Sequence, residues 1–133
     1  MGKLAVIIDD DEDDIIFLSE TLSQIDNSIE CLTFQSPTRA IIELSKLVGI
    51  VPAYIFIDYN MPIINGLECY RRLHDIEGFA MTKFILNSTN VDNELTEKFL
   101  ADGGHFIFKK PFSTEAYKRL IIQALSEQTT GSV

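Results

Sequence analysis

Five short apolar runs recur along the chain, and each has about the length of a β-strand. Most are continuously apolar rather than alternating, which is typical of strands covered by helices on both faces of a parallel sheet. The second run includes Glu30 and Thr33, so we expect it at an edge of the sheet. The runs occupy residues 4–8, 29–34, 53–57, 84–86 and 106–108.

Apolar residues at helical spacing fill the intervals between these runs. Ser36-Pro37 predicts a helix start, with an N-cap followed by proline at the first helical position. Strand and helix therefore alternate five times, which predicts an α/β fold: a three-layer sandwich of a five-stranded parallel sheet and five helices. The apolar stripes are Ile15, Leu18, Leu22 and Ile25; Ala40, Ile41, Leu44 and Leu47; Leu67, Tyr70, Leu73 and Ile76; Val91, Leu95 and Phe99; and Tyr117, Leu120, Ile121, Ala124 and Leu125.

The length of 133 residues is that of one domain with one core, and 46% of the residues are hydrophobic. We expect this domain to span residues 1–128, with a flexible tail over 129–133. No apolar run approaches the roughly 20 residues of a membrane span, and none has the form of a secretory signal. We therefore expect a cytoplasmic protein that has no membrane partner.

The formal net charge is −9, from 11 basic and 20 acidic residues. Nucleic-acid binding relies on a basic surface that neutralises phosphates, so we expect no nucleic-acid partner. Six acids are contiguous over residues 9–14. Asp13 and Asp14 suit the N-terminus of a helix, whose dipole favours negative charge. Asp9 and Asp10 directly continue an apolar strand, and that position calls for a different explanation.

Polar side chains follow four of the five predicted strands. The first strand ends in Asp9-Asp10, the third in Asp58, the fourth in Ser88 and the fifth in Lys110. Ligands of an open α/β sheet bind beyond the carboxyl ends of the strands, so these groups should converge there.

Three carboxylates at close range repel one another unless a cation lies between them. Mg²⁺ is the natural ion for such a site, because it prefers oxygen ligands and binds through one or two carboxylates, waters and a phosphate. Lys110 adds a positive charge. An aspartate beside a metal and an ammonium suits phosphoryl transfer, in which aspartate acts as the nucleophile.

Taken together, several segments resemble the receiver domain of two-component response regulators, of the stand-alone, CheY-like kind. The resemblance covers nearly the whole chain and implies the flavodoxin-like strand order 2-1-3-4-5. The segments are Val6-Ile7-Ile8-Asp9-Asp10-Asp11, Ile57-Asp58-Tyr59-Asn60-Met61-Pro62, Asn65-Gly66, Ser88 and Lys110-Pro111-Phe112.

The resemblance also implies a role for each matching residue. Asp58 would be the phosphoacceptor. Ser88 would hydrogen-bond the phosphoryl group, and Lys110 would pair with one of its oxygens. The Mg²⁺ ligands would be Asp10, Asp58, the backbone carbonyl of Asn60 and Asp9, which would act directly or through a water.

Two further expectations concern the loops around these residues. The resemblance implies a cis Lys110-Pro111 bond that aims the lysine inward. It also implies that Pro62 and Gly66 shape the loop after Asp58, with glycine allowing a backbone conformation that other residues avoid.

The chain departs from the family at Ile107, where the family usually carries a switching tyrosine or phenylalanine. Phe106 and Phe108 flank this position, but they should point to the other face of the strand. The resemblance leads us to expect phosphorylation by a sensor histidine kinase or histidine phosphotransfer protein. We further expect no separate substrate turnover, an unidentified downstream protein, and a monomer or weak dimer.

Two alternatives differ from this interpretation. A phosphatase resembling the haloacid dehalogenases also uses an aspartate nucleophile, and residues 9–11 contain its Asp-x-Asp spacing. That family expects threonine or valine where Asp13 stands, and the chain has no room for a cap. The other alternative is a phosphorylation-independent interaction module with a receiver-like fold, favoured only by Ile107.

Overall fold

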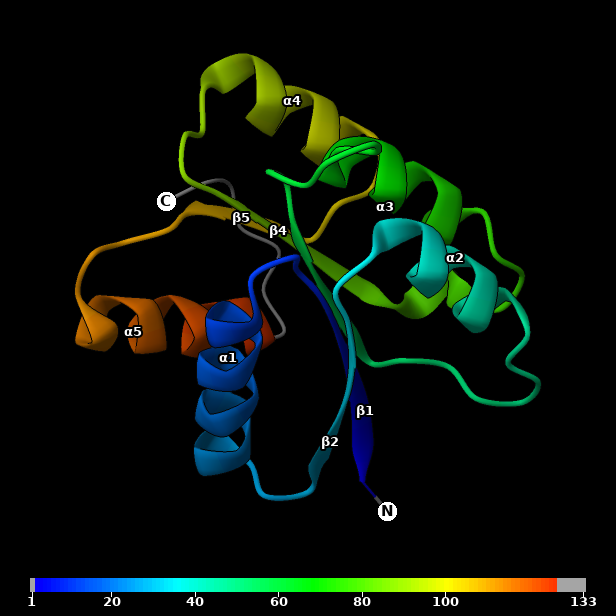
Figure 1. Ribbon diagram of the computed structural model, residues 1–133, viewed down its shortest axis with the longest axis horizontal. Helices are drawn as coiled ribbons and strands as arrows, with labels where there is room; N and C mark the ends of the chain where they lie inside the picture. Colours follow the sequence, from blue (N-terminus) through cyan, green and yellow to red (C-terminus); the bar gives the residue numbers. More distant parts are fainter. Residues whose placement is uncertain (1, 127–133) are drawn as a thin grey trace.

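The computed structural model describes residues 2–126 as a parallel five-stranded sheet between two layers of helices (Figure 1). The strand order is β2-β1-β3-β4-β5, which confirms the predicted fold class and order. All four neighbouring strand pairs are parallel. The tail expected at 129–133, and the domain boundary expected at 128, lie outside the described residues.

Each predicted run lies within or overlaps a strand, and each predicted stripe lies in or next to a helix. The strands are β1 (Lys3–Ile8), β2 (Ile29–Phe34), β3 (Tyr54–Asp58), β4 (Lys83–Ser88) and β5 (Phe106–Lys109). The helices are α1 (Glu12–Ile25), α2 (Pro37–Ser45), α3 (Gly66–His74), α4 (Asn93–Ala101) and α5 (Thr114–Leu125), with a short 3-10 helix, η1 (Phe79–Met81), that the pattern did not predict.

Three helices end or begin inside their predicted apolar stripes. Leu47 and Ile76 follow the ends of α2 and α3, and Val91 precedes α4. All three side chains still pack against the core. The helical spacing therefore identified core residues correctly but overestimated the lengths of the helices.

The sheet separates two apolar clusters because successive strand residues face opposite sides. Helices α1 and α5 cover one face, where Ile15, Leu18 and Ile121 are buried. Helices α2, α3 and α4 cover the other face, where Leu44, Tyr70 and Phe99 are buried (Figure 1). β2, at the edge, has the mixed burial that its polar residues predicted.

Side-chain caps set the beginnings of the five α-helices. Asp11 caps α1, accepting a hydrogen bond from the backbone N–H of Asp13 at 2.9 Å. Ser36 caps α2 as predicted, with Pro37 in the first turn. Only residues 9–11 separate the end of β1 from the start of α1, so Asp9 and Asp10 lie at the edge of the sheet.

None of the helices in residues 2–126 combines the length and the apolar character that crossing a bilayer requires.

Candidate phosphoacceptor and metal site

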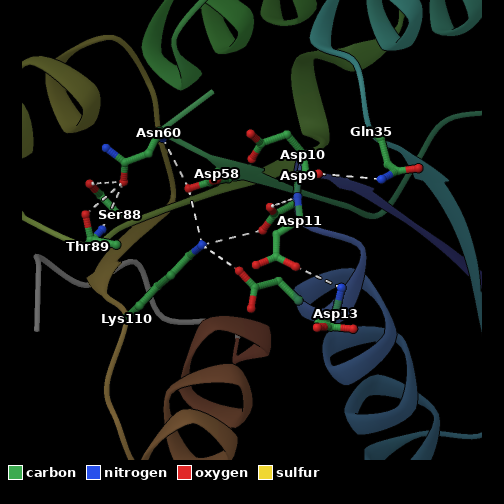
Figure 2. Close-up of polar contacts among 11 residues, drawn as sticks. Asp9, Asp10, Asp11, Asp13, Gln35, Asp58, Asn60, Ser88, Thr89 and Lys110 are labelled. Atoms are coloured by element: carbon green, nitrogen blue, oxygen red, sulfur yellow. Dashed lines mark hydrogen bonds and ion pairs between the residues drawn. The ribbon is translucent and has the colours of Figure 1, made fainter. Parts of the chain in front are cut away.

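The sequence-predicted site residues meet at the carboxyl edge of the sheet. Asp58 and Ser88 are the last residues of β3 and β4, while Asp9 and Lys110 directly follow β1 and β5. The strand order reverses between the neighbouring strands β1 and β3, where α/β sheets bind their ligands. Figure 2 shows the side chains of Asp9, Asp58 and Lys110 turned toward one another.

Three carboxylates form the centre of the site. Asp9 and Asp58 are only 4% and 3% exposed, whereas Asp10 is exposed. Asp9, Asp10 and Asp58 each offer one oxygen, and these oxygens all lie within 4.8 Å of one another. An acidic pocket of this kind, built from hard oxygen donors and open at Asp10, fits a small divalent cation such as Mg²⁺.

Burial makes the two buried acids hard to ionise, and the charge of a neighbouring carboxylate adds to the effect at each. Burial raises the pKa of Asp9 from 3.8 to about 7; the Asp11 N–H at 2.9 Å opposes this shift and the charge of Asp58 adds to it. Burial likewise raises the pKa of Asp58, although the charge of Lys110 and the backbone N–H of Asn60, at 3.2 Å, oppose the shift. A bound cation would favour the ionised form of both groups.

Lys110 places its ammonium among the acids. Its Nζ lies 3.4 Å from Asp58 Oδ1, 3.5 Å from Asp9 Oδ2 and 3.0 Å from Asp14 Oδ2. Burial alone would lower the pKa of Lys110, but the hydrogen bond to Asp14 and the charges of Asp9 and Asp58 outweigh it and raise the pKa. The lysine therefore stays charged at neutral pH.

The prediction of a cis Lys110-Pro111 bond is wrong, because no peptide bond among residues 2–126 is cis. Lys110 nevertheless reaches the acids with a trans bond. The backbone N–H of Lys110 donates to the Ser88 carbonyl at 2.8 Å, and this contact anchors the start of the β5–α5 loop beside β4.

Ser88 is buried and hydrogen-bonded to a loop residue rather than to Asp58. Its Oγ donates to Asn60 Oδ1 at 3.0 Å and accepts from the N–H of Asn90 at 3.2 Å. The backbone N–H and the hydroxyl of Thr89 donate to the same Asn60 oxygen, at 3.0 and 3.2 Å (Figure 2). The Asn60 side chain thus ties the β4–α4 loop to the β3–α3 loop.

Gly66 shapes the β3–α3 loop for a reason that the sequence did not indicate. Its φ angle is not positive; the left-handed residue of this loop is Ile63, with a φ of 71°. A Cβ at Gly66 would lie 2.6 Å from the Asp58 carbonyl oxygen and 2.6 Å from Tyr59 Cα. Glycine is required here because α3 begins against the backbone that carries Asp58.

Ile107 is fully buried and belongs to the cluster beneath α2, α3 and α4. Phe106 and Phe108 lie in the opposite cluster, beneath α1 and α5, as their alternation predicted. No aromatic ring therefore occupies the Ile107 position on the α4 side of β5.

Sequence analysis missed three side chains of the site. Asp14 was assigned to the helix dipole, although it lies four residues before the buried Leu18 and therefore on the same side of α1. The amide of Asn60 carried no signal. Asn87, 2% exposed, pairs in register with Asp58, and its Oδ1 has no hydrogen-bond partner among the described residues.

Comparison with known proteins leads to the same family as the sequence motifs. The family model of the response regulator receiver domain matches residues 5–122. A segment of 80 residues is 30% identical to the peroxide stress-activated histidine kinase mak3 of Schizosaccharomyces pombe. That segment covers 58% of this chain but only 3% of the kinase, so the comparison concerns one small part of that protein.

Solved structures with low sequence identity share the fold. The chemotaxis protein CheY4 of Vibrio cholerae has a TM-score of 0.78 at 21% identity, over 94% of this chain and 100% of that one. A CheX–CheY–BeF₃–Mg complex from Borrelia burgdorferi contains a chain with a TM-score of 0.78 at 15% identity, and the match covers 94% of this chain and 90% of that one. A Burkholderia pseudomallei response regulator with a phosphorylated aspartic acid and a calcium ion has a TM-score of 0.77 at 17% identity, and the match covers 95% of this chain and 68% of that one.

Proposed function

The chain belongs to the response regulator receiver domain family, and we propose that it accepts a phosphoryl group on Asp58 as part of a two-component signalling system. A receiver domain of two-component systems is a signalling phosphoacceptor and not an enzyme that turns over a separate substrate. The observation that carries the assignment is the position of Asp58. It is the carboxylate at the end of the central strand β3, with two other acids and the Lys110 ammonium beside it.

Asp9, Asp10, Asp58 and the backbone carbonyl of Asn60 are the proposed Mg²⁺ ligands. When bound, the ion neutralises the carboxylates and the oxygens of the incoming phosphoryl group. The oxygen-rich pocket supports this set. Related structures with BeF₃ and Mg, or with phosphoaspartate and calcium, support it by analogy.

In the proposed transfer, an Asp58 carboxylate oxygen attacks the phosphorus of a phosphohistidine. The new P–O bond forms as the P–N bond breaks, and the imidazole leaves with the bonding electrons. Lys110 pairs with one phosphoryl oxygen. Ser88 hydrogen-bonds another, for which its hydroxyl must exchange the Asn60 oxygen for the phosphoryl group. The domain would thus catalyse its own phosphorylation and, with water as the nucleophile, its dephosphorylation.

The proposed phosphoryl donor is a sensor histidine kinase or a histidine phosphotransfer protein. Two exposed apolar side chains on loops of the site support docking of a protein: Ile63, 96% exposed, and Phe112, fully exposed. They belong to the loops that follow Asp58 and Lys110. We propose the α4–β5–α5 face as the surface that contacts the downstream protein. A cytoplasmic location and a monomeric or weakly dimeric state stay predictions.

Phosphoryl uptake from acetyl phosphate tests the proposal without a cognate kinase. Intact-protein mass spectrometry should find one added phosphoryl group with Mg²⁺ and almost none with EDTA. Asp10→Asn should slow uptake and weaken Mg²⁺ binding, because it removes one ligand charge. Its metal-free form should be at least as stable as the wild type, since a crowded carboxylate is gone.

Asp11→Asn provides a matched control from the same acidic segment, because Asp11 caps α1 and is not among the proposed ligands. It should take up the phosphoryl group at close to the wild-type rate. A folded wild-type protein that takes up no phosphoryl group with Mg²⁺ would favour the alternative, a phosphorylation-independent interaction module.

A further inference from the structure

A fourth carboxylate, outside the proposed metal ligands, contacts the lysine of the site. Asp14 Oδ2 lies 3.0 Å from Lys110 Nζ, closer than the oxygens of Asp58 and Asp9. The contact joins the first turn of α1 to the β5–α5 loop across 96 positions of the chain. Side chains of both partners are partly withdrawn from solvent, Lys110 at 16% and Asp14 at 33% exposure.

This contact differs from the ordinary preference of a helix N-terminus for acids. Asp13 occupies the same first turn near the positive end of the dipole, but it is exposed and forms no ion pair among the described residues. Asp14 lies on the inner side of the helix and faces the lysine. An ion pair that is partly shielded from water is less screened than an exposed one.

The phosphoryl group must compete with Asp14 for Lys110. The ammonium has three N–H donors and already lies among three carboxylates. The Asp14 charge also repels an incoming anion directly. Loss of Asp14 would leave Lys110 protonated, since Asp9 and Asp58 still flank it.

We propose that Asp14 is a positioning residue that holds the Lys110 ammonium in its resting place and weakens the binding of the phosphoryl group at Asp58. The inference rests on the proposed function, because it assigns Lys110 to the phosphoryl oxygens. It adds a residue of α1 that sets how strongly the site retains a phosphoryl group.

Binding of beryllofluoride, an analogue of the phosphoryl group, tests the proposal. Its dissociation constant in excess Mg²⁺ can be measured by fluorine NMR for the wild type and three variants. Asp14→Asn should bind beryllofluoride about three- to tenfold more tightly, the gain that removal of one nearby, partly screened charge provides. Asp13→Asn, the matched control, should stay within about twofold of the wild type. Asp14→Glu should restore near wild-type binding.

Mg²⁺ binding without beryllofluoride gives a second readout, which should not follow the gain in beryllofluoride binding. Asp14→Asn removes a negative charge, so it should bind Mg²⁺ no more tightly than the wild type. Tighter binding of both ions would indicate a rearranged site and would overturn the inference. The inference would also be overturned if Asp14→Asn bound beryllofluoride only as tightly as Asp13→Asn does, or more weakly than the wild type does.

The two proposals fail in different ways. Wild-type protein that does not bind beryllofluoride with Mg²⁺ would contradict the proposed function and, with it, this inference. Wild-type binding without the gain in Asp14→Asn would contradict only the role of Asp14.

Discussion

Asp9 shows most clearly how the fold changes the properties of a single side chain. It is 4% exposed beside Asp58, and burial raises its pKa to about 7. A carboxyl group with this pKa is largely protonated under mildly acidic conditions, where an exposed aspartate is ionised. At Asp9, proton binding and the proposed cation binding therefore compete.

The raised pKa of Asp9 predicts how stability depends on pH in the absence of metal. Between its unfolded pKa, near 3.8, and about 7, the folded state binds more protons than the unfolded state. The free energy of unfolding should therefore fall as pH rises through this range, and the raised pKa of Asp58 acts in the same direction. Urea denaturation in EDTA at several pH values measures the slope.

Asp9→Asn provides the comparison, because its side chain does not titrate. The variant should lose part of the pH dependence and should be relatively more stable at neutral pH. Identical slopes in the two proteins would contradict a raised pKa at Asp9.

At the scale of elements, the β4–α4 segment is the part best placed to respond to phosphorylation. The Asn60 oxygen holds Ser88 and Thr89 through three hydrogen bonds, so recruitment of Ser88 would break one of them. Within α4 only Phe99 is buried, and Leu95 and Leu100 pack against the core partly exposed, so this helix has few fully buried side chains. By contrast, Ile107 in β5 is fully buried and has no large ring to move.

Hydrogen exchange with and without beryllofluoride tests this difference between elements. The segment from Ser88 to Leu95 should change its exchange rates, and β5 should respond more weakly. A ligand shifts a conformational equilibrium only through different interactions with the two states, and the proposed recruitment of Ser88 would provide that difference here. Asp58→Asn serves as the control and should show little change. Changes confined to α1, with residues 88–95 silent, would point to another mode of output.

At the scale of the whole molecule, local patterns predicted the elements well and the contacts between them poorly. Continuous apolar runs and helical stripes indicated both layers and the edge position of β2. The strand order needed the resemblance to a family. The Asp14 contact could not be predicted in this way, because Asp14 lies in the first turn of α1 and not at the end of a strand. The reason for a glycine at position 66 could not be predicted either, because a side chain there would clash with the backbone of Asp58 and Tyr59.

In the site, too, local patterns predicted some residues and missed the contacts between loops. Asp9, Asp10, Asp58 and Lys110 could be predicted because strand ends share one edge of a parallel sheet. The hydrogen bonds of the Asn60 amide could not, because they depend on how two loops fold against each other. A strand-end residue is therefore easier to place from sequence than a residue that acts from a loop.

The central claim is that Asp58 receives the phosphoryl group, and chemical trapping tests it most directly. Borohydride cleaves an acyl phosphate and converts the aspartate that carried it to homoserine, which peptide mass spectrometry then locates. After treatment with acetyl phosphate and Mg²⁺, the account predicts homoserine at Asp58 and none in Asp58→Asn. Homoserine at Asp9 or Asp10 instead, or an unmodified Asp58 in a protein that carries phosphate, would contradict it.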